Sequence, residues 1–278
     1  MNATQDNDYI YLYEIFINHK FNIIVLMNKI KFITFSILTL ALILFTLLNL
    51  DTTKKIVVND HPIEYKIPIY LKFFNFFNRH YNYKYFVKKI NANKYSKEEI
   101  IINTSKWVHQ NIKKIPEGVD SVDSDPLSII TRRLGAQYQF SDILSVLLTY
   151  SDIETYLFNN HPHQLTFFKI NNYWSVLDPY YGIFFINEKE TFASIDDLKK
   201  NEWRIVNFSS QKINLMDISK IFYNDFKNYD EVKDHYRKIF INIKTGKQID
   251  DIKTFNRGRA YLQKPFNRIK FEIYKIFK

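Results

Sequence analysis

The chain of 278 residues contains no cysteine. Disulfide bridges, thiolate metal ligands and cysteine nucleophiles are therefore excluded, although this absence does not indicate a redox compartment. Glycine is also scarce, with 5 residues. The C-terminal third carries no glycine-rich phosphate loop, no internal repeat and no paired carboxylate motif. What remains is a chain long enough to bury a real core in one or two domains.

Acidic residues are too few to balance the basic ones, which leaves a formal net charge of +10. Such a charge suits an anionic partner such as a membrane face, a nucleic acid or an acidic glycan. No nucleic-acid-binding motif of basic and aromatic residues stands out beside it, which argues against nucleic acid. The joint richness in Lys, Asn, Ile, Phe and Tyr is more typical of a compositional bias of a genome than of a function.

Charge is missing altogether from the 19 residues between Phe32 and Leu50. This is about the length that crosses a bilayer as a helix, and no small-x-small cleavage site follows it. We predict an uncleaved signal anchor at 27–50, with a cleaved signal and a buried core helix as the alternatives. Lysines flank the stretch on both sides and fix its orientation poorly. Because most of the chain follows a single span, we expect the C-terminal part to be exported, to a periplasmic or other extracytoplasmic side.

The segments on either side of the span give weaker signals. Met27 begins a sequence that looks like the natural start of such an anchor, so 1–26 is interpreted as a poorly defined segment outside the native start. Residues 51–95 mix charged and aromatic residues without a clean period, and we predict a connector with a short amphipathic helix. This helix would rest on lipid headgroups or pack against the globular domain. The residues expected at the headgroups are Phe73, Phe74, Phe76, Phe77, Lys72 and Arg79.

Three helix starts follow the connector. A capping box at Ser96–Glu99 predicts a helix that runs to Lys114. Asp125-Pro126 predicts a second helix, with Asp at the N-cap and Gly135 as the C-cap glycine. The third helix is expected straight after Gly135 and as far as about Tyr150.

Two short apolar runs then flank Asn171-Asn172, which predicts a two-residue hairpin turn because Asn tolerates the positive φ that such turns need. The pairing sets Phe168 against Ser175. Side chains alternate between the two faces of a strand, so His163 and Asp178 fall on one face as diagonal neighbours within hydrogen-bond reach. Three helices followed by a hairpin indicate an α+β domain.

These features together resemble the transglutaminase-like superfamily, whose core has the papain-like cysteine-protease architecture. The resemblance covers roughly residues 96–200. It is carried by separate features that occur in the family's order: Trp107-Val, Gly135-Ala-Gln137, His163, Trp174-Ser-Val-Leu-Asp178-Pro179-Tyr-Tyr-Gly182 and Ala193-Ser-Ile-Asp-Asp-Leu198. It implies helices packed on a small antiparallel sheet. Beyond it, the sequence pattern predicts a helical extension at 201–278.

The resemblance also implies a catalytic triad, from which one member is missing. In the family a cysteine at a helix start attacks an acyl carbon, a histidine activates it and an aspartate orients the histidine. His163 and Asp178 match the last two, but Gln137 stands at the nucleophile position, and a carboxamide is not a nucleophile. We therefore expect a non-catalytic binding or scaffold module at the cell envelope that uses no cofactor. A peptide, a glycan or a segment of an envelope protein would occupy its cleft.

The alternative is an active hydrolase or acyltransferase that acts on an amide or peptide. His163 and Asp178 would then activate water, a relocated nucleophile or a metal. Of the candidate nucleophiles, Tyr138 is the next residue after Gln137, and Ser141 lies one turn, about 5.4 Å, further along the helix. A metal could be held by His161 together with His163 and Asp178. Two histidines around a proline are a weak zinc signal, and we expect no metal.

The C-terminal third contains helical pieces predicted at 216–228 and 231–240. From Pro265 onward, apolar residues at helical spacing alternate with basic ones, which predicts a basic amphipathic helix. The two sets are Phe266, Ile269, Ile273 and Phe277, and Arg268, Lys270, Lys275 and Lys278. Such a helix usually packs on its own domain. In the alternative, the helix binds an anionic membrane surface or an assembly partner, and the protein functions through this tail.

Overall fold

The computed structural model describes residues 3–58, 61–93, 96–116, 119, 123–160, 163–208, 226 and 228–276. The chain forms two compact units. One unit comprises residues 1–53 and 66–73, and the other comprises residues 54–65 and 74–278.

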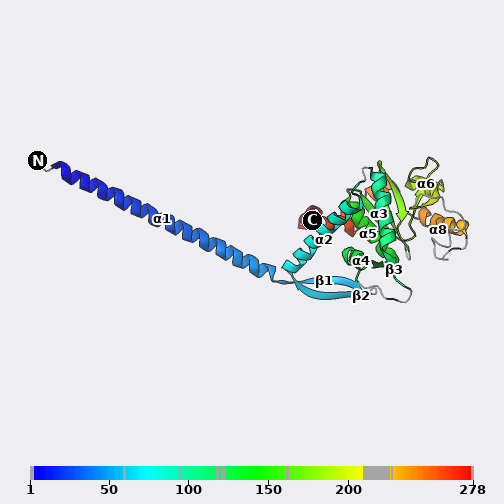
Figure 1. Cartoon of the computed structure of the whole chain (residues 1–278), viewed down its shortest axis with the longest axis horizontal. Helices are drawn as coiled ribbons and strands as arrows, with labels where there is room; N and C mark the ends of the chain where they lie inside the picture. The colour runs from blue at the N-terminus through cyan, green and yellow to red at the C-terminus, as the bar shows by residue number, and fades with distance from the viewer. Residues whose placement is uncertain are drawn as a thin grey trace. The chain divides into compact units, whose positions relative to one another are not determined.

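The first unit consists mainly of α1 (Ala3–Leu48), the long blue helix in Figure 1. Its part from Leu26 to Leu48, 23 residues, is long and apolar enough to cross a membrane, a property that signal sequences near an N-terminus share. The side chains of this part are exposed. The predicted apolar helix is thus confirmed as far as Leu48, while its orientation in a membrane stays a prediction.

A hairpin and a long helix occupy the predicted connector. β1 (Asp51–Val58) pairs with β2 (His61–Pro68), and α2 (Ile69–Ile90) follows directly. The hairpin brings the chain back to its own start, because the backbone N–H of Ile69 donates to the carbonyl of Leu50 at 3.0 Å. The helix has 22 residues and is therefore longer than predicted.

The second half of α2 packs into the core of the second unit. Tyr83 is fully buried there, and Phe86 and Val87 are partly buried against the same cluster. Of the two alternatives predicted for this helix, lipid headgroups or the globular domain, its second half therefore packs against the globular domain.

The predicted helices of the second unit are present as α3 (Lys97–Asn111), α4 (Pro126–Arg132) and α5 (Gln137–Tyr150). The prediction that the first of them runs to Lys114 is wrong, because Lys113 and Lys114 form a short strand. The capping box before α3 is confirmed: Ser96 Oγ accepts from the N–H of Glu99 at 3.1 Å. Asp125 stands at the N-cap of α4 as predicted, but its side chain makes no capping hydrogen bond. It lies 4.0 Å from the guanidinium of Arg79 instead.

The prediction that Gly135 caps α4 is wrong. The helix ends at Arg132, and Arg133 takes the left-handed conformation with φ of 56°. Gly135 lies in a short strand, β4 (Leu134–Gly135), that pairs in parallel with β3 (Lys113–Lys114). A Cβ at Gly135 would lie 3.2 Å from the side chains of Ile112 and Ile129, so a close approach requires glycine here rather than a positive φ.

A five-stranded antiparallel sheet completes the α+β fold, in the order β5-β6-β7-β8-β9. The strands are β5 (Thr155–Asn160), β6 (His163–Ile170), β7 (Tyr173–Asp178), β8 (Ile183–Ile186) and β9 (Arg204–Asn207). The predicted hairpin is confirmed between β6 and β7. Asn171 and Asn172 have φ of 46° and 66°, and Phe168 lies opposite Ser175.

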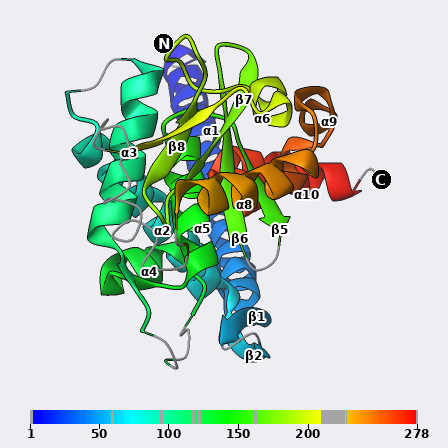
Figure 2. The ribbon, with the colours of Figure 1, turned by 90° about the vertical axis from the view of Figure 1, so that its right-hand side faces the viewer.

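The sheet is buried on both faces. On one face, Phe168 and Leu177 belong to a cluster with residues of α3, α4 and α5. On the other, Phe167 and Val176 belong to a cluster with residues of the C-terminal helices. These helices, labelled in Figure 2, are α6 (Ile195–Lys200), α8 (Tyr229–Ile241) and α9 (Gly246–Asp250). Strands covered on both faces read as nearly continuous apolar runs, as they do here.

The end of the chain contains two short 3-10 helices and a last α-helix. They are η1 (Thr254–Asn256), η2 (Arg259–Gln263) and α10 (Pro265–Ile276). α10 confirms the predicted C-terminal helix. Its Phe271 packs on Phe255, whereas Phe266, Ile269 and Ile273 are exposed.

The other two predictions for the C-terminal third have different outcomes. The helix predicted at 231–240 is confirmed as α8. The piece predicted at 216–228 lies outside the described residues, except for Phe226 and Asn228.

The hairpin turn gives a first test of the fold. Asn172→Val should lower the free energy of unfolding by about 1–2 kcal/mol, because a β-branched side chain is strained at positive φ. Asn172→Gly should leave it unchanged or raise it. Urea unfolding of the full chain in detergent, followed by tryptophan fluorescence, measures both. Equal stability of the two variants would contradict the turn.

Candidate functional site

The start of α5 is where the resemblance places a nucleophile. Ala136 is the N-cap and Gln137, which is half-buried, is the first helical residue. The side chain of Gln139 closes this helix end, because its Oε1 accepts from the N–H of Ala136 at 3.0 Å. Arg132 also donates to that oxygen, at 3.3 Å. The end of the helix is thereby fixed, and a carboxamide occupies its first position.

Asp178 ends β7 and is fully buried. Its Oδ1 accepts from the backbone N–H groups of Tyr180 at 3.0 Å and Tyr181 at 3.2 Å, which forms the turn after the strand. Its Oδ2 accepts from the hydroxyl of Tyr236 at 2.6 Å. A buried carboxylate is tolerated only when such donors replace its water, so this group is held by its own chain.

Tyr236 was missed by sequence reasoning. It lies on α8, 58 residues from Asp178, and its ring is fully buried. Burial raises the pKa of its phenol well above the ordinary value, and the charge and hydrogen bond of Asp178 raise it further. The phenol therefore stays protonated and donates. The available signal was a tyrosine within the apolar stripe of a helix, because a buried hydroxyl needs a partner.

His109, on α3, faces the same turn from another side. Its Nδ1 lies 3.1 Å from the carbonyl oxygen of Pro179, so Nδ1 carries the proton of the neutral ring. Burial lowers the pKa of this imidazole, and the nearby charge of Lys114 lowers it further. Gly182 packs on the ring: with φ of +72°, a Cβ there would lie 2.7 Å from His109 Nε2. Sequence reasoning singled out neither the histidine nor this contact.

Lys114 connects the turn to the start of α5. Its backbone pairs with Gly135, and its ammonium lies 3.7 Å from the ring centroid of Tyr180. A cation over an aromatic face at this distance is attracted by the ring. The edge of the same Tyr180 ring packs against Phe140, at 5.3 Å between centroids, and Phe140 lies one turn after Gln137. The turn, the cation and the helix start therefore form one packed group.

The histidine half of the predicted dyad is not tested. The backbone of His163 pairs with Asn160 at the start of β6, but its side chain and the whole of His161 lie outside the described residues. The register that the prediction needs is present between Thr166–Ile170 and Tyr173–Leu177. Among the described residues, no group of three or more His, Asp or Glu is placed to hold a metal. The dyad and the metal alternative stay predictions.

The relocated nucleophile is disfavoured at Ser141. This residue is fully buried, and its Oγ donates to the carbonyl of Gln164 at 2.6 Å. A nucleophilic hydroxyl must be accessible and hydrogen-bonded to a base, and Ser141 is neither accessible nor bonded to one. The hydroxyl of Tyr138 lies 3.4 Å from the side-chain nitrogen of Gln139.

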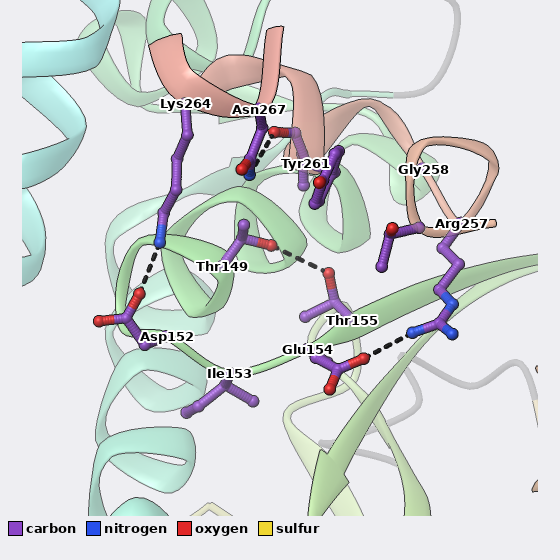
Figure 3. A pocket seen from close by; sticks show the side chains of 12 residues that line it. Thr149, Asp152, Ile153, Glu154, Thr155, Arg257, Gly258, Tyr261, Lys264 and Asn267 are labelled. Atoms are coloured by element: carbon purple, nitrogen blue, oxygen red, sulfur yellow. Dashed lines mark hydrogen bonds and ion pairs between the residues drawn. The ribbon is translucent and has the colours of Figure 1, made fainter. Parts of the chain in front are cut away.

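A pocket of about 200 Å³ lies at the opposite end of α5 (Figure 3). Two ion pairs flank it, Lys264 with Asp152 and Arg257 with Glu154, both at 2.6 Å. None of the predicted site residues lines it. α5 is 14 residues long, so the pocket and the start of the helix are separated by about 20 Å.

Loss of the hydroxyl in Tyr236→Phe should lower the free energy of unfolding by about 1.5–3 kcal/mol, because Asp178 then loses a donor inside the core. Chemical denaturation of the full chain in detergent measures the effect. Tyr81→Phe is the control: its side chain is 64% exposed, and a change within about 0.5 kcal/mol is expected. A Tyr236→Phe protein as stable as the control would show that the bond is dispensable.

The lowered pKa of His109 predicts a loss of stability in acid. The unfolded chain binds a proton near the ordinary pKa of about 6.5, whereas the folded chain binds it only at lower pH. The contribution is therefore fully present above about pH 6.5 and is lost as the pH falls toward the folded pKa. His109→Gln, which does not titrate, should show a shallower loss between pH 7.5 and pH 5. Parallel curves for the two proteins would contradict the assignment.

Comparison with known proteins finds no matching family model and no matching curated protein. Among solved structures, the chain is similar to a candidate cysteine protease from Cytophaga hutchinsonii, at 15% identity and a TM-score of 0.30, over 45% of this chain and 41% of that one. It is also similar to a candidate protease from Parabacteroides distasonis, at 12% identity and a TM-score of 0.31, over 48% of this chain and 27% of that one. This chain thus spans less than half the length of both, and similarities of this size do not identify a function.

Proposed function

We propose that the protein is a membrane-anchored, non-catalytic transglutaminase-like protein that acts as a binding or scaffold module at the cell envelope. The module comprises residues 96–200, behind a signal anchor at 27–50 and a connector at 51–95, and residues 201–278 extend it. The observation that carries the proposal is that the acid of the pattern, Asp178, is present without a cysteine nucleophile. Asp178 is buried and accepts from Tyr236 and from two backbone amides of its own turn, which gives it a structural role that needs no catalysis.

The residue at the helix start supports the same conclusion. Gln137 begins α5, and the chain has no cysteine anywhere that could replace it. A helix start stabilises negative charge, which suits a thiolate, but a neutral amide there can only donate and accept hydrogen bonds. Gln137 would therefore bind a carbonyl or hydroxyl of a ligand rather than attack it.

The groups around this position are held in place rather than free to react. The ammonium of Lys114 is buried against Tyr180, and the imidazole of His109 is kept neutral by burial. Ser141, one turn after Gln137, donates to a backbone carbonyl. A peptide, a glycan or a segment of an envelope protein offers the carbonyl and hydroxyl groups that the amide of Gln137 can bind.

The apolar part of α1 supplies the anchor. Its 23 residues from Leu26 to Leu48 are enough for one span. With a single span ahead of the rest of the chain, the module would lie on the extracytoplasmic side, which is the arrangement expected of an envelope protein.

Restoring a thiol tests the proposal. In Gln137→Cys, the thiol pKa should fall below its ordinary value of about 8.5, because the helix start and a histidine at 163 favour the thiolate. Alkylation by iodoacetamide as a function of pH measures this pKa in the full chain, which has no other cysteine. The part of the shift that the histidine supplies should be lost when His163→Ala is added. Tyr138→Cys, one residue further along the helix, is the matched control: it shares the helix start, so its pKa should be lowered less and should not change when His163→Ala is added.

Two outcomes would contradict the proposal. An ordinary pKa in Gln137→Cys would show that the helix start is not a former nucleophile site. The unaltered chain could instead hydrolyse or transamidate a peptide amide and lose this activity in His163→Ala. That result would show that the protein is an active hydrolase or acyltransferase.

A further inference from the structure

α2 exposes a continuous aromatic stripe. Six of its aromatic side chains are between 43% and 67% exposed, at spacings of one, three or four residues that place them on one side of the helix. They are Tyr70, Phe73, Phe74, Phe77, Tyr81 and Tyr85. Each ring left in water forgoes about 25 cal/mol per Å² of apolar surface, so a stripe of this length calls for a partner.

The opposite side of the helix is fixed by the core. Tyr83 is fully buried, and the ring nitrogen Nδ1 of His80 lies 2.8 Å from the hydroxyl of Tyr150. Of the residues predicted at lipid headgroups, Phe76 is half-buried and Arg79 is engaged by Asp125, so both belong to this inner side. Because the inner side is anchored in this way, α2 cannot turn its aromatic stripe toward the core.

The start of α2 lies where the apolar part of α1 ends. The hairpin between them returns on itself, and the N–H of Ile69 donates to the carbonyl of Leu50 at 3.0 Å. Lys72 reinforces the junction through its ammonium, which donates to the hydroxyl of Thr52 and the carbonyl of Thr53, both at 3.2 Å. If the apolar part of α1 spans a bilayer, the first rings of the stripe begin at its headgroup level.

The charge on α2 identifies the chemistry of the partner. The helix has no acidic residue, and its basic residues are Lys72, Arg79, Lys84, Lys88 and Lys89. Lys84 and Lys88 are exposed and fall on the same side as the aromatic rings by helical spacing. Helices that lie in a membrane interface typically combine these two kinds of residue. Their aromatic rings lie at the headgroup boundary, and their lysines reach the anionic phosphates. A protein interface, by contrast, is depleted of lysine at its core.

We propose that α2 lies in the headgroup region of an anionic bilayer on its aromatic stripe. The inference rests on the proposed anchor and goes beyond it, because the chain would then hold the membrane with two elements, a span and an in-plane helix.

Single cysteines in the cysteine-free chain test the inference. Phe77→Cys and Tyr81→Cys place a bimane label on the stripe, Leu40→Cys places it in the apolar part of α1, and Ile241→Cys places it on α8. Ile241 is 61% exposed and serves as the matched apolar control. The full chain is reconstituted in vesicles of phosphatidylcholine and phosphatidylglycerol, and each label is quenched by brominated lipid and, separately, by iodide in the water.

We expect the labels at 77 and 81 to be quenched by brominated lipid and protected from iodide, and the label at 241 to show the reverse. If the label at 40 escapes brominated lipid, the anchor fails and the inference fails with it. If only the label at 40 is quenched, the anchor stands and the interfacial helix is overturned. Protection from iodide at 77 and 81 without quenching by lipid would assign the stripe to a protein partner or a second copy of the chain, and would likewise overturn it.

Discussion

A carboxylate buried inside a protein must receive hydrogen bonds from the chain that buries it, because an unpaired charge in the core costs several kcal/mol. Asp178 is such a group, and much of the second unit follows from how it is satisfied. Two amides of the following turn bind one oxygen, and the phenol of Tyr236 binds the other. The first contact sets the path of residues 179–182, and the second attaches α8 to the end of β7. Nδ1 of His109 then donates to the carbonyl of Pro179, and the ring packs against Gly182.

The same constraint bears on how a site of this kind can lose its chemistry. Under the proposed function, Gln137 stands in place of a nucleophile whose only task was the reaction, so the replacement would leave the fold nearly untouched. The acid of the pattern has a second task, since Asp178 also holds a turn and a distant helix. Removing it would leave Tyr236 and two turn amides without their acceptor. A sequence can therefore keep the acid of a triad after the cysteine has gone, and the presence of the acid is no evidence that the reaction survives.

Local signals predicted much of the fold. The capping box at Ser96 and the turn at Asn171-Asn172 were predicted correctly because each depends on residues within a few positions of one another. Gly135 was assigned to the wrong role, since the reason for a glycine there is the approach of Ile112 and Ile129 from other elements. In the candidate site, the motif predicted a role for Asp178, but Tyr236 and His109 lie 58 and 70 residues from the groups they bind. No periodicity within a window connects residues so far apart.

The connector shows a different limit of sequence reasoning. α2 carries aromatic rings on both sides, with Tyr83 and Phe86 toward the core and Phe77 and Tyr81 exposed. A helix that is apolar on both sides gives no clean period of 3.6, so its pattern indicated neither its length nor the side that packs. Charge distinguishes what hydrophobicity does not. Arg79 is paired with Asp125 at the start of α4, while the lysines of the exposed side have no acidic residue on the helix to pair with. An aromatic surface that keeps only positive charge beside it suits a lipid headgroup layer better than it suits water or a second protein.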